Sequence, residues 1–86
     1  MRTTRIKNLL TDNFSPSKME IIDFTNEHRG HSGQDGSDET HIRLHIGGEV
    51  FEDLTLLESH RRIQDCLKAE FASGLHALEI HILKWF

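Results

Sequence analysis

The sequence predicts an α+β fold in which two helices cover one face of a three-stranded mixed sheet. Apolar residues recur at helical spacing over residues 4–14 and 56–72. They alternate with polar residues over residues 40–46, and shorter apolar runs occupy residues 18–25 and 76–83. The resulting order is α-β-β-α-β, which we expect to form a single domain over all 86 residues.

The first expected helix covers residues 4–14. Its apolar side chains lie on one helical face, at Ile6, Leu9, Leu10 and Phe14. Thr3 or Thr4 can cap the start, because a hydroxyl accepts a hydrogen bond from a free backbone N–H of the first turn. Pro16 disfavours helical backbone at the preceding residue, Ser15, so we expect the helix to end there.

A strand and a long loop follow this helix. Residues 18–25 come after the proline and contain isoleucine and phenylalanine, which favour strands. Residues 26–39 contain three glycines and no aliphatic side chain, which indicates a solvated loop. A loop of this length between two strands usually has a function of its own or is disordered.

The clearest strand covers residues 40–46. One face carries Ile42, Leu44 and Ile46, and the opposite face carries His41, Arg43 and His45. This alternation indicates a strand that is buried on the first face and exposed to solvent on the second. Gly47 and Gly48 end the strand.

The second expected helix covers residues 56–72. Its predicted buried stripe consists of Leu56, Ile63, Leu67 and Phe71. Gly74 is placed to end this helix. Cys66 lies beside the stripe, and we expect it to be a small buried apolar side chain and not a reactive thiol.

The last expected strand covers residues 76–83 and directs Leu78, Ile80 and Ile82 to one face. His76 has the same parity as these residues, which points it toward the covered side of the sheet. It is either a hydrogen-bonded histidine at the edge of the core or a metal ligand. The apolar end that follows, Lys84–Phe86, either covers the sheet edge or forms an exposed contact.

The connections predict the strand directions. The first two strands are joined without a helix and should be antiparallel, whereas a helical crossover joins the second and third, which should be parallel. The first strand therefore ends at the sheet edge where the other two begin. We expect four of the seven histidines to lie near this edge: His28, His31, His41 and His76.

The remaining histidine patterns are weaker. His28 and His31 have no cysteine or acidic partner at a fixed spacing, so they do not form a metal site by themselves. His41 and His45 would lie roughly 13 Å apart on one strand, too far to share an ion. We interpret His41, His45 and His81 as strand residues on the solvent-exposed face of the sheet.

The composition excludes several classes of protein. One cysteine excludes a disulfide framework or a cysteine-based zinc site within one chain. No apolar run approaches membrane-spanning length, and no signal-peptide pattern is present, so we expect a cytoplasmic protein. The net charge of −4 gives no general attraction to nucleic acid. No nucleophile has an identifiable base and no glycine loop could cradle a phosphate, so we expect no enzymatic activity.

Several short motifs stand in a characteristic order along the chain. They are Met19-Glu20-Ile21-Ile22-Asp23, His28-Arg29-Gly30-His31-Ser32-Gly33, Glu39-Thr40-His41-Ile42, His60-Arg61, Glu70-Phe71 and Gly74-Leu75-His76-Ala77-Leu78. Together they resemble the BolA-like family over nearly the whole chain. The resemblance implies an α-β-β-α-β fold with an additional short helical turn, similar to a type II KH domain.

The resemblance also implies a function as an adaptor. BolA-like proteins pair with a monothiol glutaredoxin and share a [2Fe–2S] cluster with it, for iron–sulfur trafficking or iron regulation. The partner and its glutathione supply thiolates, and imidazole can replace thiolate on one iron. His76 matches the family's C-terminal ligand, and His28 matches the loop ligand, with His31 as the near alternative. The resemblance thus implies the histidine-loop branch, with a chain that is monomeric alone and heterodimeric with its partner.

A second interpretation is a nucleic-acid-binding transcriptional regulator. The KH-like fold and the association of some BolA-like proteins with transcription motivate it. Arg61, Arg62 and Lys68 are the candidate contacts for a phosphate or an acidic partner. The acidic charge balance and the lack of a Gly-x-x-Gly loop argue against it.

Overall fold

In the computed structural model of the protein, which describes residues 1–25 and 40–83, the predicted order of helices and strands appears with two additions. The helices are α1 (Arg2–Phe14), α2 (Glu49–Glu52), α3 (Leu56–Cys66) and α4 (Lys68–Ala72), and the strands are β1 (Lys18–Asp23), β2 (His41–Gly47) and β3 (Ala77–Ile82). The additions are α2 and the division of the second predicted helix. The predictions for residues 26–39 and 84–86, including His28 and His31, lie outside the described residues.

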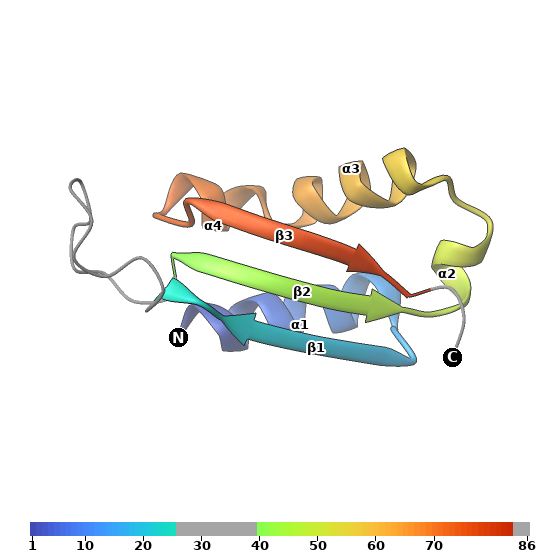
Figure 1. The fold of residues 1–86 in the computed structure, drawn as a ribbon, viewed down its shortest axis with the longest axis horizontal. Coiled ribbons are helices and arrows are strands. Elements are labelled where there is room, and N and C mark those ends of the chain that lie inside the picture. Colours follow the sequence, from blue (N-terminus) through green and yellow to red (C-terminus); the bar gives the residue numbers. More distant parts are fainter. Residues whose placement is uncertain (26–39, 84–86) are drawn as a thin grey trace.

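The three strands form one mixed sheet in the order β1-β2-β3. β1 pairs antiparallel with β2, with Ile21 opposite Leu44, and β2 pairs parallel with β3, with Leu44 opposite Ile80. In Figure 1, α1 passes behind the sheet while α3 and α4 run along β3. These pairings confirm the predicted α+β fold and the predicted strand directions.

The core lies between the sheet and the helices. Ile42, Leu44 and Ile46 of β2 are fully buried, as their alternation predicts. They pack against Ile6, Leu10, Phe51, Ile63, Leu67 and Leu75. The opposite side of β2 carries polar side chains that remain partly exposed. Burial of one sheet face is therefore what holds the helices to the strands.

The start of α1 differs from the prediction. The helix begins at Arg2, Met1 occupies the cap position, and no side chain caps it, so the predicted cap by Thr3 or Thr4 is wrong. The reason is tertiary, because the Arg2 guanidinium donates a hydrogen bond to the carboxylate of Glu70, 68 residues away, from Nε at 3.0 Å. This contact gives Arg2 a fixed place in the first turn.

The ends of α1 and β1 follow local rules more closely. α1 ends at Phe14, and Ser15 takes a left-handed conformation with φ 45° directly before Pro16. The prediction that the proline region ends the helix is confirmed. β1 ends at Asp23 and not at residue 25. Thr25 instead uses its polar atoms in hydrogen bonds at the sheet edge.

The continuous helix predicted over residues 56–72 is wrong, because Leu67 interrupts it between α3 and α4. Thr55 and Glu58 fix the start of α3 through a capping box, in which each side chain accepts a hydrogen bond from the other's backbone N–H. The preceding α2 is four residues long, too short for helical periodicity to reveal it. Its Phe51 is fully buried.

The buried stripe predicted on this segment is partly wrong. Ile63 and Leu67 are fully buried, but Leu56 is 60% exposed and Phe71 is 38% exposed. The buried positions that complete the stripe are polar, namely Ser59 and Glu70. Ser59, Ile63, Leu67 and Glu70 follow one another at spacings of four, four and three residues, which places Glu70 and not Phe71 on the inward face. Leu56 lies in the first turn of α3, ahead of the point where the helix meets the core.

Ser59 gives a stability prediction. Its side chain is fully buried, and its Oγ has no hydrogen-bond partner within the described part of the chain. Ser59→Ala removes an unsatisfied hydroxyl and adds a better helix former, so we expect stabilisation by about 1 kcal/mol. In a domain of this size that raises the thermal midpoint by about 4 to 8 °C.

The matched control is Ser73→Ala. The Ser73 hydroxyl donates to the backbone carbonyl of Glu70 at 3.2 Å, so its removal should not stabilise the protein. Thermal unfolding followed by circular dichroism compares the two variants. A midpoint for Ser59→Ala at or below that of the wild type would contradict the prediction.

Candidate functional site

Two histidines from distant parts of the chain meet at one edge of the sheet. His41 opens β2, and His76 directly precedes β3, which runs parallel to β2. Their ring centroids are 6.1 Å apart, with the planes at 73°. The predicted proximity of His41 and His76 is thus confirmed, and it follows from strand direction. We call the pair, with the strand ends around it, the histidine edge.

Backbone hydrogen bonds fix the position of His76. The Thr40 carbonyl oxygen accepts from the N–H groups of both His76, at 2.8 Å, and Ala77, at 3.1 Å. The preceding turn contains Gly74 with φ +130°, a conformation that L side chains rarely adopt. The predicted role of Gly74 in ending the helical segment is confirmed. The turn then delivers His76 to the start of β2.

The prediction that His76 points toward the covered side of the sheet is wrong. Its side chain is exposed, and its ring packs against the ring of His41, a residue of the outer face. Strand parity applies only within the strand, and β3 begins one residue later, at Ala77. As a consequence, the His76 imidazole is accessible from outside the fold.

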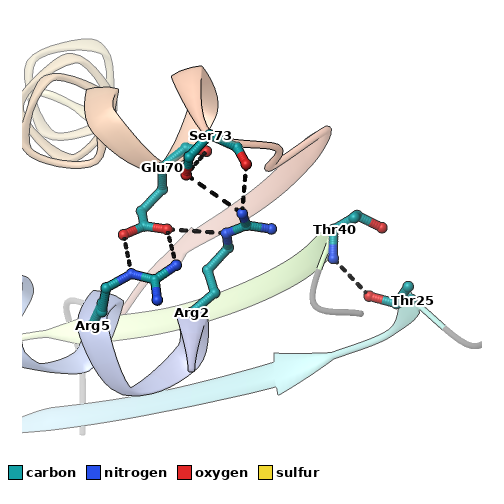
Figure 2. A network of polar contacts seen from close by, with 6 residues as sticks. All are labelled: Arg2, Arg5, Thr25, Thr40, Glu70 and Ser73. Carbon is teal, nitrogen blue, oxygen red and sulfur yellow. Dashed lines mark hydrogen bonds and ion pairs between the residues drawn. The ribbon is translucent and has the colours of Figure 1, made fainter. Parts of the chain in front are cut away.

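A threonine network ties together the strand ends at this edge. Thr25 Oγ1 accepts hydrogen bonds from the backbone N–H of Thr40 at 3.0 Å and of His41 at 3.2 Å, and it donates to a carboxylate oxygen of Asp23. Figure 2 shows the bond between Thr25 and Thr40. Both threonines are 1% exposed. These two residues flank residues 26–39, so the network ties together the two points of the described structure between which that segment runs.

His41 makes more contacts at this edge than expected for a residue on the solvent-exposed face of a strand. Its Nδ1 lies 2.9 Å from Thr40 Oγ1, and its ring lies 5.7 Å from that of Phe24. The Arg43 guanidinium covers the Phe24 ring at 4.7 Å. The signal that could identify His41 is the parallel register, which pairs it with Ala77. A residue at the start of one strand must lie beside the residue that enters its parallel neighbour.

A buried ion-pair network holds the turn that precedes His76. Glu70 is 4% exposed and accepts hydrogen bonds from Arg2 Nε at 3.0 Å, Arg5 Nε at 2.8 Å and Arg5 Nη2 at 3.0 Å. Arg2 Nη2 also donates to the Ser73 carbonyl at 3.0 Å (Figure 2). Hydrogen bonds from Arg5, and then from Arg2, outweigh burial and lower the pKa of Glu70. The network joins α1 to the end of α4.

The predicted basic contacts lie on the helices. Arg61 and Arg62 are exposed on α3, and Lys68 is exposed at the start of α4. Hydrogen bonds from Thr55 lower the pKa of Glu58, and the nearby charge of Arg62 adds to this effect. Glu58 and Arg62 are four residues apart on α3, the spacing at which opposite charges interact on a helix surface. No contact in the described structure assigns these three residues a ligand.

Cys66 behaves as the sequence predicts. It is partly buried, packs against the core and has its Sγ 3.8 Å from the Leu9 carbonyl oxygen. Burial raises the pKa of its thiol, and the charge of Asp65 adds to this. A raised pKa keeps the sulfur protonated and unreactive. Within residues 1–25 and 40–83, no three histidine, cysteine or acidic side chains gather closely enough to hold a metal ion.

The comparisons with known proteins agree with this architecture. A family model described as BolA-like protein matches residues 10–84. A Sinorhizobium sp. relative, an uncharacterized protein in the cobS 5′ region, is 38% identical over 79 residues, which cover 91% of this chain and 85% of that protein. Protein BOLA1, chloroplastic, from Arabidopsis thaliana is 36% identical over 81 residues, which cover 92% of this chain. The solved BolA domain of SufE1 from Arabidopsis thaliana matches with a TM-score of 0.85 and 36% identity, covering 96% of this chain and 91% of that one.

The relatives differ in length and location. The chain spans only 51% of the length of the chloroplastic BOLA1 protein, whose name also places it in an organelle. The cytoplasmic location expected here therefore stays a prediction. Across the described ranges, no helix combines the length and apolar character needed to cross a lipid bilayer. Because one family model matches most of the sequence and the fold is shared at substantial identity, the chain belongs to the BolA-like protein family.

Proposed function

We propose that this chain is a non-enzymatic adaptor that pairs with a monothiol glutaredoxin and holds a [2Fe–2S] cluster shared between the two proteins. The observation that carries the proposal is the histidine edge, where the accessible His76 ring lies 6.1 Å from that of His41. The fixed ends of the loop that contains His28 and His31 lie at the same edge. The His76 imidazole, with His41 beside it, is thus available to an external ligand.

The side chains at this edge fit the chemistry of such a cluster. Imidazole is an established ligand of iron in [2Fe–2S] centres, where it replaces thiolate and raises the reduction potential. The described residues do not assemble three ligands of their own, and the single cysteine is partly buried with a thiol whose pKa burial raises. Thiolates from a glutaredoxin and its glutathione would complete the set. The role of this chain is then to present His76, with His28 or His31, on a rigid edge.

Hydrogen bonds to the backbone around His76 and His41 set the positions of these two residues. Thr40 holds the His76 peptide through its carbonyl, while Thr25 holds the Thr40 and His41 peptides through its hydroxyl. Groups that orient a ligand are worth about 10- to 100-fold in metal affinity in comparable sites. The chain would therefore offer a ligand whose orientation is set before the partner arrives.

The main test replaces His76 with alanine. The wild-type chain, mixed with a monothiol glutaredoxin, glutathione, iron and sulfide, should give a one-to-one complex with a visible absorption spectrum distinct from that of the glutaredoxin homodimer. His76→Ala should retain at least about tenfold less cluster in the mixed complex, because it removes one ligand. His60→Ala on α3 is the matched control and should behave as the wild type. A mixed spectrum that survives His76→Ala would overturn the ligand assignment.

The loop ligand is tested in the same assay. His28→Ala and His31→Ala are compared singly and together, and one single variant should reproduce most of the loss. If the double variant binds the cluster like the wild type, the loop does not supply a ligand. In that case, loss of the cluster in His41→Ala would show that His41 supplies the second ligand in place of the loop histidine.

Nucleic-acid binding is the alternative function. Its candidate contacts, Arg61, Arg62 and Lys68, are exposed, but the acidic Glu58 lies one helical turn before Arg62. A gel shift that weakens as salt increases, and that is lost in Arg61→Ala with Arg62→Ala but retained in His76→Ala, would support this alternative. The adaptor proposal expects no such shift.

A further inference from the structure

A second pair of histidines lies on the outer face of the sheet. His45 of β2 and His81 of β3 are Cα partners in the parallel register. Their ring centroids are 4.7 Å apart, and the planes are inclined by 35°. His81 is exposed and His45 is partly exposed. Figure 1 shows this end of β2 and β3 without a helix in front of it.

This pair is separate from the histidine edge. Along β2, His45 lies four residues after His41, which corresponds to roughly 13 Å. The row between them is occupied by Arg43 and Glu79, whose side chains form an ion pair. One ion cannot reach both histidine pairs across this distance. Any ligand of His45 and His81 is therefore bound independently of the proposed cluster.

The spacing of the two rings suits a single metal ion. At a metal–nitrogen distance of about 2.0 Å, two imidazoles bound cis to one ion have ring centroids about 4.5 to 5.3 Å apart. The observed 4.7 Å lies in this interval, near the value for the 90° angle of tetragonal coordination. Neighbouring parallel strands hold the two backbones, so little conformational entropy is lost on binding.

The surrounding charges also favour a cation. Glu20 of β1 is the Cα partner of His45 and is exposed on the same side of the sheet. Glu79 lies two residues before His81 on β3, and its carboxylate pairs with Arg43. Two carboxylates therefore flank the imidazoles, and Arg43 is already paired with one of them.

We infer that His45 and His81 form a binding site for one late first-row divalent metal ion, held cis by two imidazoles with water in the remaining positions. Imidazole suits copper, nickel and zinc, and tetragonal geometry favours Cu²⁺ and Ni²⁺. Cu²⁺ should bind more tightly than Ni²⁺ or Zn²⁺, following the general affinity order of nitrogen sites. The described residues contain no group of three histidine, cysteine or acidic side chains that could hold a metal ion. The protein therefore supplies only two ligands, and the ion should exchange readily with solvent.

The test uses Ni²⁺ and the full chain. An ion that joins β2 to β3 only in the folded state raises the thermal midpoint as its concentration increases. The wild type should gain several degrees at about 1 mM NiCl₂. His45→Gln and His81→Gln should each lose most of this gain and bind Ni²⁺ at least about tenfold more weakly by calorimetry. His60→Gln is the control and should keep the wild-type response.

A variant that lacks the proposed cluster ligands separates this inference from the proposed function. The triple variant His28→Gln, His31→Gln and His76→Gln lacks the proposed cluster ligands and should still gain stability from Ni²⁺. Paramagnetic broadening of amide signals should then begin at His45 and His81. If Ni²⁺ stabilises the His45→Gln and His81→Gln variants as it does the wild type, or broadens no signal near these residues, the inferred site does not exist.

Discussion

Phe51→Ala is expected to lower the free energy of unfolding by about 3 to 5 kcal/mol. Phe51 is fully buried, and its ring lies 5.3 Å from that of Phe14 with the planes inclined by 36°. Removal of the ring leaves a cavity where α2 and α1 meet. A domain of this size has about 5 to 10 kcal/mol of stability in total, so the variant should lose roughly half of it.

Urea unfolding followed by circular dichroism measures this effect. Val50→Ala is the matched control, because Val50 is the neighbouring residue on α2 and is 36% exposed. It should change the stability by less than about 1 kcal/mol. Phe51→Leu, which keeps most of the volume, should fall between the two. Equal losses for Phe51→Ala and Val50→Ala would show that α2 does not contribute to the core through Phe51.

Glu70→Gln is expected to lower the free energy of unfolding by about 2 to 3 kcal/mol. The substitution keeps the shape of the side chain. It removes the negative charge and replaces one of the two carboxylate oxygens, which accept hydrogen bonds from Arg2 and Arg5, with an amide NH₂ group. The side chain of Arg2 is 11% exposed and would lose its counter-charge inside the fold. The side chain of Arg5 is 53% exposed, so solvent would compensate most of its loss.

The contribution of Glu70 should depend on pH. Its pKa is lower in the folded chain than its ordinary value of 4.5, so the folded state favours the ionised carboxylate. The stabilisation is therefore complete above pH 4.5 and is lost as the pH falls through the folded-state pKa. The difference in unfolding free energy between the wild type and Glu70→Gln should shrink on acidification over this range.

Glu79→Gln is the matched control for this pH profile. Glu79 also pairs with an arginine, Arg43, but both side chains are substantially exposed. Its loss should change stability far less than the loss of Glu70. The Glu70 network also holds the turn before His76, so Glu70→Gln should loosen the histidine edge. A pH-independent stability difference for Glu70→Gln would contradict the ion-pair network.

Chain topology explains which parts of the site are predictable. The two connections between strands are enough to predict strand direction, and strand direction brings His41 and His76 to a common edge. The orientation of His76 is not predictable in this way, because that residue precedes β3 and is not subject to strand parity. Its direction depends on the Gly74 turn and on the Thr40 carbonyl.

The sequence by itself determined the class of the fold, the pairing of the strands and the buried face of β2, because these depend on the spacing of apolar residues and on the lengths of the connections. Tertiary structure alone decided three features: the burial of Phe51 on a helix of four residues, the break at Leu67, and the inward direction of Glu70. The physical reason, for Phe51 and Glu70, is that their burial depends on partners far away in the chain. A carboxylate can be buried at residue 70 only because two arginines from the first helical turns reach it, and no local pattern records that contact.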